Sequence, residues 1–220
     1  MTTSLITGAN RGIGLELARQ LKARGDRVVA VCRSSSPELD ALGATIEAGI
    51  DVSTAAASGA LSSRLAETRI DVLIANAGVL KPDSLEHLDF DDIVRQFEIN
   101  ALGALRTVHA LLPQLHEGAK VALITSRMGS IADNGSGNFY GYRMSKAALN
   151  AAGVSLARDL HSRGIAVAIL HPGYVRTDMT ARQGGVEPAE AARQLIARID
   201  ALTLQTSGTF WHANGEVLPW

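Results

Sequence analysis

Short, almost continuously apolar runs alternate with longer amphipathic segments along the chain. Runs that are apolar at nearly every position are typical of parallel strands buried on both faces. They predict strands over 4–8, 27–32, 44–50, 71–78, 120–126 and 165–173, with helices over about 12–24, 55–68, 89–115, 140–163 and 187–202. A last apolar stretch, SGTFWHANGEVLPW, predicts an edge strand. This alternation predicts a doubly wound α/β sheet, which binds ligands beyond the carboxyl ends of its strands.

Composition and charge narrow the class of protein. Of the 220 residues, 46% are hydrophobic and 20% are charged, which is ordinary for a globular protein, and no linker divides them. We therefore expect one domain over residues 1–220. A formal net charge of −1 gives no indication of nucleic acid or of a membrane surface as a partner. The single cysteine, Cys32, cannot form an intrachain disulfide, and the chain shows neither a signal peptide nor a membrane-spanning run, so we expect a cytoplasmic protein.

A glycine-rich loop, TGANRGIG over residues 7–14, joins the first predicted strand to the first helix. Gly8, Gly12 and Gly14 suit a sharp turn, a diphosphate close to the backbone and a helix packed against the strand. Free amides at the helix start would then face the phosphates, assisted by the helix dipole. Glycines at this spacing also occur in plain tight turns, but their place between strand and helix indicates dinucleotide binding.

The end of the second predicted strand, AVCRSS, indicates which dinucleotide is bound. Folds that bind NAD place an acidic residue about 20 positions past the glycines to hold the ribose 2′-hydroxyl, whereas arginine suits a 2′-phosphate. Arg33 stands at that place, and no acidic residue lies between Asp26 and Glu38. Arg11, inside the glycine loop, would add a second positive charge. Both could instead be solvated surface residues, but together they favour NADP over NAD.

The segment YGYRMSK, residues 140–146, holds two tyrosines ahead of one lysine. On a helix, side chains four positions apart share a face, whereas those six apart diverge. Tyr142 and Lys146 are four apart, and Tyr140 and Lys146 are six apart. If the segment is helical, only Tyr142 shares a site with Lys146.

Five segments occur in an order and spacing that resemble the short-chain dehydrogenase/reductase family, and the resemblance covers nearly the whole chain. They are TGANRGIG, NAG (76–78), TSRMGSI (125–131), YRMSK (142–146) and PGYVRTDM (172–179). Within the family, YRMSKAALN and the ending GEVLPW are most similar to the single-domain carbonyl reductase and C-factor-like branch. The resemblance implies a Rossmann fold with a mainly parallel seven-stranded sheet in the order 3-2-1-4-5-6-7.

The resemblance also implies catalytic roles. Tyr142 would exchange a proton with the substrate oxygen, with its pKa lowered by the Lys146 ammonium, and Lys146 would bind the nicotinamide ribose. Ser126 would donate a hydrogen bond to that oxygen, and Asn100 would hold a water that links Lys146 to solvent. Ser130 would fit the shorter serine-to-tyrosine spacing usual in the family, because DNGSGN (133–138) resembles an insertion. Ser126 is preferred because it ends the predicted strand.

The same resemblance implies a set of NADP(H)-binding residues. Asp51 and Val52 would contact the adenine, residues 76–78 would lie beneath the cofactor, and Val175 and Thr177 would meet the carboxamide and the diphosphate. The full set is Gly8, Asn10, Arg11, Gly12, Ile13, Gly14, Arg33, Asp51, Val52, Asn76, Ala77, Gly78, Tyr142, Lys146, Pro172, Gly173, Val175 and Thr177. No spacing of histidine, cysteine and carboxylate residues indicates a metal site.

These observations predict an NADPH-dependent oxidoreductase that reduces a small-molecule ketone, aldehyde or quinone to an alcohol, with Tyr142 as the proton donor. The alternative is a noncatalytic NADP-binding sensor or signalling protein on the same fold. An extended-type dehydratase or epimerase would need a substrate domain after the sixth strand, and about 47 residues follow Gly173. The resemblance further implies a homo-oligomer, a dimer or tetramer, that pairs through the helices over about 89–115 and 140–163.

Overall fold

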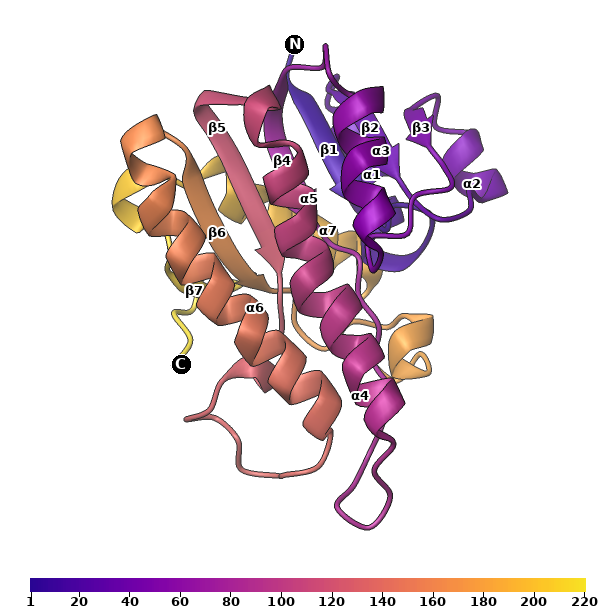
Figure 1. Cartoon of the computed structure of the whole chain (residues 1–220), viewed down its shortest axis with the longest axis vertical. Coiled ribbons are helices and arrows are strands. Elements are labelled where there is room, and N and C mark those ends of the chain that lie inside the picture. Colours follow the sequence, from indigo (N-terminus) through magenta and orange to yellow (C-terminus); the bar gives the residue numbers. More distant parts are fainter.

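The predicted apolar runs form one parallel sheet in the computed structural model, which describes residues 1–220. The strand order is β3-β2-β1-β4-β5-β6-β7, which confirms the predicted Rossmann topology (Figure 1). The last apolar stretch supplies the edge strand, which pairs in parallel with its neighbour. The strands are β1 (Thr3–Thr7), β2 (Arg27–Val31), β3 (Thr45–Glu47), β4 (Ile70–Ala75), β5 (Leu115–Ile124), β6 (Ala166–His171) and β7 (Phe210–His212).

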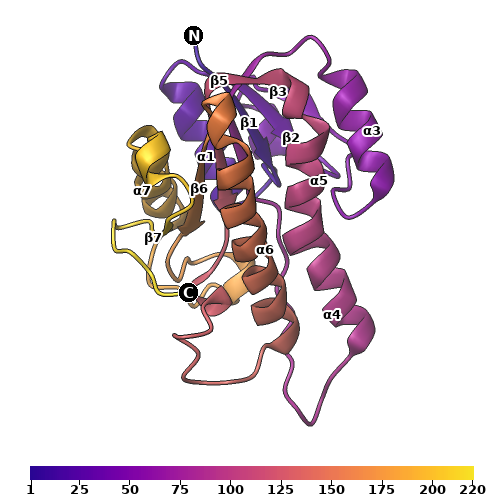
Figure 2. The same cartoon turned by 60° about the vertical axis from the view of Figure 1, so that its left-hand side comes forward.

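Helices cover both faces of the sheet (Figure 2). On one face lie α1 (Gly12–Ala23) and α7 (Pro188–Asp200), which pack against each other. On the other lie α3 (Ala55–Arg64), α5 (Gly103–Ala110) and α6 (Tyr140–Asp159), with α4 (Phe90–Phe97) beside the start of α6. The sequence pattern did not indicate the short helix α2 (Pro37–Asp40) or the single helical turns η2 (Leu112–Gln114), η3 (Arg127–Gly129), η4 (His161–Arg163), η5 (Asp178–Thr180) and η6 (Leu204–Thr206).

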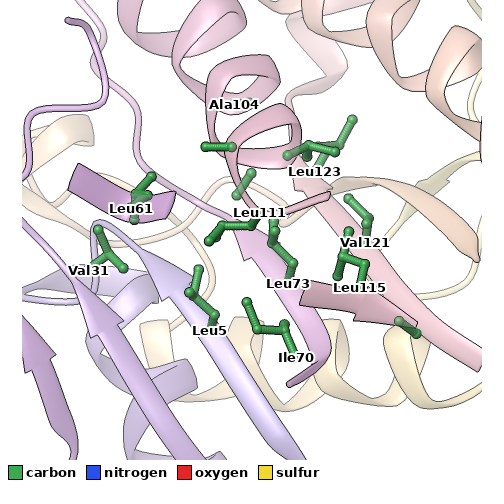
Figure 3. Packing of buried hydrophobic residues seen from close by; sticks show 14 of the residues in the cluster. Leu5, Val31, Leu61, Ile70, Leu73, Ala104, Leu111, Leu115, Val121 and Leu123 are labelled. Carbon is green, nitrogen blue, oxygen red and sulfur yellow. The ribbon is translucent and has the colours of Figure 1, made fainter. Parts of the chain in front are cut away.

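The core consists of two apolar layers, one on each face of the sheet. Alternate residues of a strand point to opposite faces, so Leu5 joins the layer under α3, α5 and α6 while Ile6 joins the layer under α1 and α7. Figure 3 shows part of the first layer, in which Leu61 of α3 and Ala104 of α5 lie on the helix side and Leu73 of β4 lies on the strand side. Burial on both faces explains why the strands are apolar at nearly every position.

The predicted helix over 89–115 is wrong in two respects. A π-helical turn, η1 (Glu98–Leu102), separates α4 from α5, and α5 ends at Ala110. Pro113 lacks the amide that would continue the helix, and the chain passes through η2 into β5, which begins at Leu115 instead of residue 120. Asn100 lies inside the π-helical turn, a local geometry that is frequent at functional sites.

The loops that follow the strands gather at one edge of the sheet. In Figure 1 the segments that precede α4 and α6 extend beyond the carboxyl ends of the strands. A doubly wound sheet binds its ligands at this edge. No helix of the structure has the length and apolar character needed to cross a membrane.

Candidate active site

A cleft of about 400 Å³ opens at the carboxyl ends of the strands. Of the predicted cofactor residues, those that line it are Gly8, Asn10, Arg11, Gly12, Ile13, Gly14, Arg33, Asp51, Val52, Asn76, Ala77, Gly78, Tyr142, Lys146, Pro172 and Thr177. Gly173 and Val175 are not among the lining residues. Val175 is instead buried and forms an isolated bridge with Val186.

Sequence reasoning missed several residues of the cleft wall. Asp178 and Met179 directly follow Thr177 in the quoted segment PGYVRTDM, so their position offered a signal. Thr125 directly precedes Ser126 in the quoted segment TSRMGSI, so its position also offered a signal. The others are apolar residues or cysteine, which carry no such signal: Val31, Cys32, Ile50, Val79, Ile99 and Ile124.

The glycine loop leaves no room for side chains where strand and helix meet. A Cβ on Gly14 would lie 2.2 Å from the Gly8 carbonyl oxygen and 2.6 Å from Asn76 Nδ2. The Asn76 amide donates to the carbonyl oxygens of Thr7 and Gly8, at 3.1 and 3.2 Å, and so supports the loop from β4. No side chain caps the start of α1 at Arg11, so the first helical amides face the cleft unpaired. This cradle fits the diphosphate of a dinucleotide.

The end of the cleft formed by Arg11, Arg33 and Asp51 carries positive charge. Arg11 and Arg33 are exposed, line the cleft and form no ion pair. Partial burial raises the pKa of the Asp51 carboxyl, but hydrogen bonds from Ser53 and the charges of Arg33 and Arg95 outweigh it and hold that pKa below its ordinary value. Asp51 is therefore an acceptor at neutral pH, and both arginines remain free to bind an anion.

Tyr142 and Lys146 lie on the buried face of α6, as their spacing predicts. Tyr142 is 7% exposed and Lys146 is 4% exposed, whereas Tyr140 is 38% exposed at the first turn. Lys146 Nζ lies 5.8 Å from the centre of the Tyr142 ring and donates to the Ile124 carbonyl oxygen at 2.9 Å. The helix thus brings Tyr142 and Lys146 to the same cleft and leaves Tyr140 outside it.

The ionisation of this pair differs from the expectation that Lys146 lowers the pKa of Tyr142. Burial raises the pKa of the Tyr142 phenol to about 12, although the nearby Ser126 hydroxyl opposes the change. Burial also lowers the pKa of the Lys146 ammonium to about 8. Loss of water disfavours the charged form of each group, and at this separation desolvation outweighs their attraction. The free protein therefore keeps its proton on Tyr142 at neutral pH.

The two candidate serines occupy different environments. Ser126 follows β5, is buried, accepts from the Met128 amide at 3.2 Å, and lies near the Tyr142 phenol, where it opposes the rise in pKa that burial causes. Ser130 is also buried, but its hydroxyl accepts from the Asp133 amide at 3.1 Å and so holds the loop that follows η3. The arrangement favours Ser126 as the hydroxyl beside a substrate oxygen.

Asn100 is buried beneath the cleft, and its side chain is fully engaged. Its Oδ1 accepts from the Val79 amide at 2.8 Å, and its Nδ2 donates to the Val79 carbonyl at 2.9 Å and to Ser145 Oγ at 2.9 Å. The Asn100 side chain therefore anchors the loop after β4 to η1 and α6. A Cβ on Gly78 would lie 3.2 Å from Asn100 Oδ1 and 3.6 Å from Lys146 Nζ, so Asn100 is a close neighbour of the lysine.

Comparison of the sequence with known proteins finds a family model and relatives that are consistent with a nucleotide-binding cleft. The family model for short chain dehydrogenase matches residues 2–187. A 1-hydroxy-2-glutathionyl-2-methyl-3-butene dehydrogenase of Rhodococcus sp. (strain AD45) is 46% identical over 226 residues and covers 100% of both chains. The C-signal protein of Myxococcus xanthus is 46% identical over 154 residues, which cover 69% of this chain and 93% of the relative.

Solved structures show the same fold. The NADPH-bound carbonyl reductase from chicken fatty liver superposes with a TM-score of 0.90 at 28% identity, over 100% of this chain and 99% of that chain. The matched family segment contains the glycine loop, Ser126, Tyr142 and Lys146. The chain therefore belongs to the short-chain dehydrogenase family, as an oxidoreductase built around a nicotinamide-cofactor cleft.

Proposed function

We propose that this protein is an NADPH-dependent reductase of small-molecule ketones, aldehydes or quinones, with Tyr142 as the proton donor. One observation supports this most directly: the buried Tyr142, with the Ser126 hydroxyl nearby, borders the same cleft as Lys146. A protonated phenol beside a second hydroxyl can donate its proton to a carbonyl oxygen as negative charge develops there, while the second hydroxyl donates a hydrogen bond.

Each side chain of the site has a separate role in the proposed reaction. When bound, the cofactor supplies the hydride to the carbonyl carbon. Tyr142, whose pKa of about 12 keeps it protonated, transfers its proton to the developing alkoxide. Ser126 donates a hydrogen bond to the same oxygen. Lys146, with a pKa of about 8, is mainly charged at neutral pH; it binds the ribose and stabilises the phenolate that remains. The Asn100 side chain, which is fully hydrogen-bonded to Val79 and Ser145, holds the loop beneath the lysine and is not assigned the predicted role of holding a water.

The alternative is an NADP-binding sensor or signalling protein that does no chemistry. The similarity to a protein named C-signal gives this alternative its support. A binding protein, however, needs neither a proton donor nor a lysine that stabilises the resulting phenolate. Tyr142 and Lys146 are both present and both buried at the cleft, which favours catalysis.

The relatives suggest which substrates to test. One is named for the oxidation of a hydroxyl in a glutathione conjugate and another for carbonyl reduction. The panel should therefore contain ketones, aldehydes and quinones with NADPH, and hydroxyl-bearing glutathione thioethers with NADP⁺, each followed by absorbance of the reduced nicotinamide.

Tyr142→Phe tests the proton donor. This variant keeps the ring and its packing but removes the hydroxyl, so turnover should fall by about 10²–10⁴, the usual loss for a general acid. Cofactor affinity should change little, because Lys146 holds the ribose. Tyr140→Phe is the matched control and should keep kcat, with a modest change in KM allowed. A wild-type protein that binds NADPH but turns over nothing on the panel would favour the sensor alternative, and full activity in Tyr142→Phe would refute the proposed donor.

We propose NADPH, not NADH, because Arg11 and Arg33 lie unpaired at the same end of the cleft as Asp51. A charge-assisted bond to a phosphate contributes about 1.5–3 kcal/mol, which corresponds to about tenfold or more in affinity. Arg33→Asp should weaken NADPH binding by at least that factor and leave NADH binding nearly unchanged, as measured by fluorescence titration. Equal affinities of the unmodified protein for both cofactors would contradict the assignment.

A further inference from the structure

Asp83 binds three consecutive backbone amides at the start of α6. Its carbonyl oxygen accepts from the Phe139 amide at 2.9 Å. One carboxylate oxygen accepts from the Tyr140 amide, and the other accepts from the Gly141 amide at 2.9 Å. The next residue is Tyr142. A single residue that is distant in sequence therefore holds the whole entry into the helix that carries the proposed proton donor.

The start of α6 has no cap of its own. Its N-cap residue, Phe139, carries no polar side chain and adopts a left-handed φ of 54°, and Asn138 before it has a φ of 53°. Two successive left-handed residues other than glycine are unfavourable and persist only where their surroundings hold them. The first amides of a helix also need acceptors, which a local Ser, Thr, Asn or Asp usually supplies. At α6 the acceptors come from Asp83.

Asp83 ends a strap, residues 79–83, that is held at alternate positions. The Asn100 side chain binds both backbone groups of Val79, and Gln96 Oε1 accepts from the Lys81 amide at 3.0 Å. Gln96 is 2% exposed, and a Cβ on Gly141 would lie 2.6 Å from its Nε2 and 3.2 Å from Asp83 Oδ2. The strap therefore links η1, α4 and the first turn of α6 into one closely packed unit.

We propose that Asp83 is a positioning residue for Tyr142, an inference that rests on the carbonyl reduction proposed above. Asp83 fixes the first turn of α6 so that the Tyr142 hydroxyl stays buried beside Ser126. Lys146 lies one turn further along and is anchored separately to the Ile124 carbonyl. Loss of the Asp83 carboxylate should therefore disturb proton transfer and leave cofactor binding largely intact.

Asp83→Ala and Asp83→Asn test this role, with Asp89→Ala as the control. Asp89 caps α4 by accepting from the Asp92 amide at 3.1 Å, so its loss removes an N-cap from a helix that does not carry Tyr142. A small misplacement of a reacting group can cost about 10²-fold. We expect kcat to fall about 10–100-fold in Asp83→Ala and less in Asp83→Asn, which keeps one acceptor oxygen. The Kd for NADPH should stay within about threefold, and Asp89→Ala should keep kcat.

Hydrogen exchange followed by mass spectrometry provides a readout that does not depend on activity. The amides over 139–146 should exchange faster in Asp83→Ala, and those of α7 should not. Unchanged exchange at 139–146, or an unchanged kcat in Asp83→Ala, would overturn the positioning role. If the wild-type protein reduces no carbonyl but the amides over 139–146 still exchange faster in Asp83→Ala, the proposed function fails. The role of Asp83 in fixing the start of α6 is then retained.

Discussion

At the scale of the residue, Tyr142 and Lys146 are both withdrawn from water, and this has opposite effects on the two pKa values. The phenol pKa rises to about 12 and the ammonium pKa falls to about 8. Each change favours the neutral form, because a buried charge loses its hydration. The resting site therefore holds a protonated acid, which suits carbonyl reduction, and it offers no phenolate for alcohol oxidation until the proton leaves.

The two pKa values predict how carbonyl reduction depends on pH. Lys146 is charged below about pH 8 and neutral above it, whereas Tyr142 keeps its proton up to about pH 12. The kcat/KM for NADPH, which reports the free protein, should therefore be level from pH 6 to 7 and fall as the pH rises through about 8, because the phenolate loses its cationic partner. A kcat/KM that stays constant from pH 6 to 10 would show that Lys146 does not titrate in this range.

At the scale of the element, α6 is positioned by close backbone approaches. A Cβ on Gly129, in η3, would lie 2.8–2.9 Å from the carbonyl group of Lys146 and 3.0 Å from the amide nitrogen of Ala147. Ser126 lies three residues before Gly129, so this contact sets the distance between η3 and α6. The backbone atoms of Lys146 and Ala147 cannot move aside as a flexible side chain can. A side-chain atom added at Gly129 would therefore have to displace either η3 or α6.

Gly129→Ala should therefore reduce both stability and turnover. Overpacking of this kind typically costs about 1–3 kcal/mol of unfolding free energy, and it would displace Ser126 from Tyr142. Gly135→Ala is the matched control, because it lies in the same loop and a Cβ there would meet nothing within 4 Å. The urea midpoint of unfolding and kcat should both fall in Gly129→Ala and stay unchanged in Gly135→Ala. Equal unfolding midpoints for the two variants would contradict the close approach.

At the scale of the whole molecule, one apolar surface lacks a partner. Phe90, Val94 and Phe97 are spaced four and three apart on α4 and are exposed, together with Leu105 of α5 and Met144 of α6. Such spacing places α4 side chains on one face of the helix. Exposed apolar residues that gather on neighbouring helices commonly mark an interaction site, and we propose that a second copy of the chain covers this surface through the same helices.

Sedimentation at micromolar concentration tests the proposed oligomer. We expect a species of twice the 23.1 kDa chain mass or more, and we expect Val94→Glu to dissociate it, because burial of an unpaired carboxylate is costly. Val217→Glu is the control, since Val217 is also exposed but lies near the C-terminus. A single 23.1 kDa species for the unmodified protein would refute the oligomer.

The resemblance to a known family predicts the strand order. The sequence by itself determined the alternation of strands and helices, the glycine loop, and the choice of Tyr142 over Tyr140. These features depend on local spacing: burial on both faces makes a strand apolar throughout, and four positions along a helix return a side chain to the same face. The tertiary structure decided the rest. The raised pKa of Tyr142 comes from burial, and the cap of α6 comes from Asp83, which lies 57 positions before Tyr140. Desolvation and long-range contacts depend on which segments the fold brings together, and no local pattern records that.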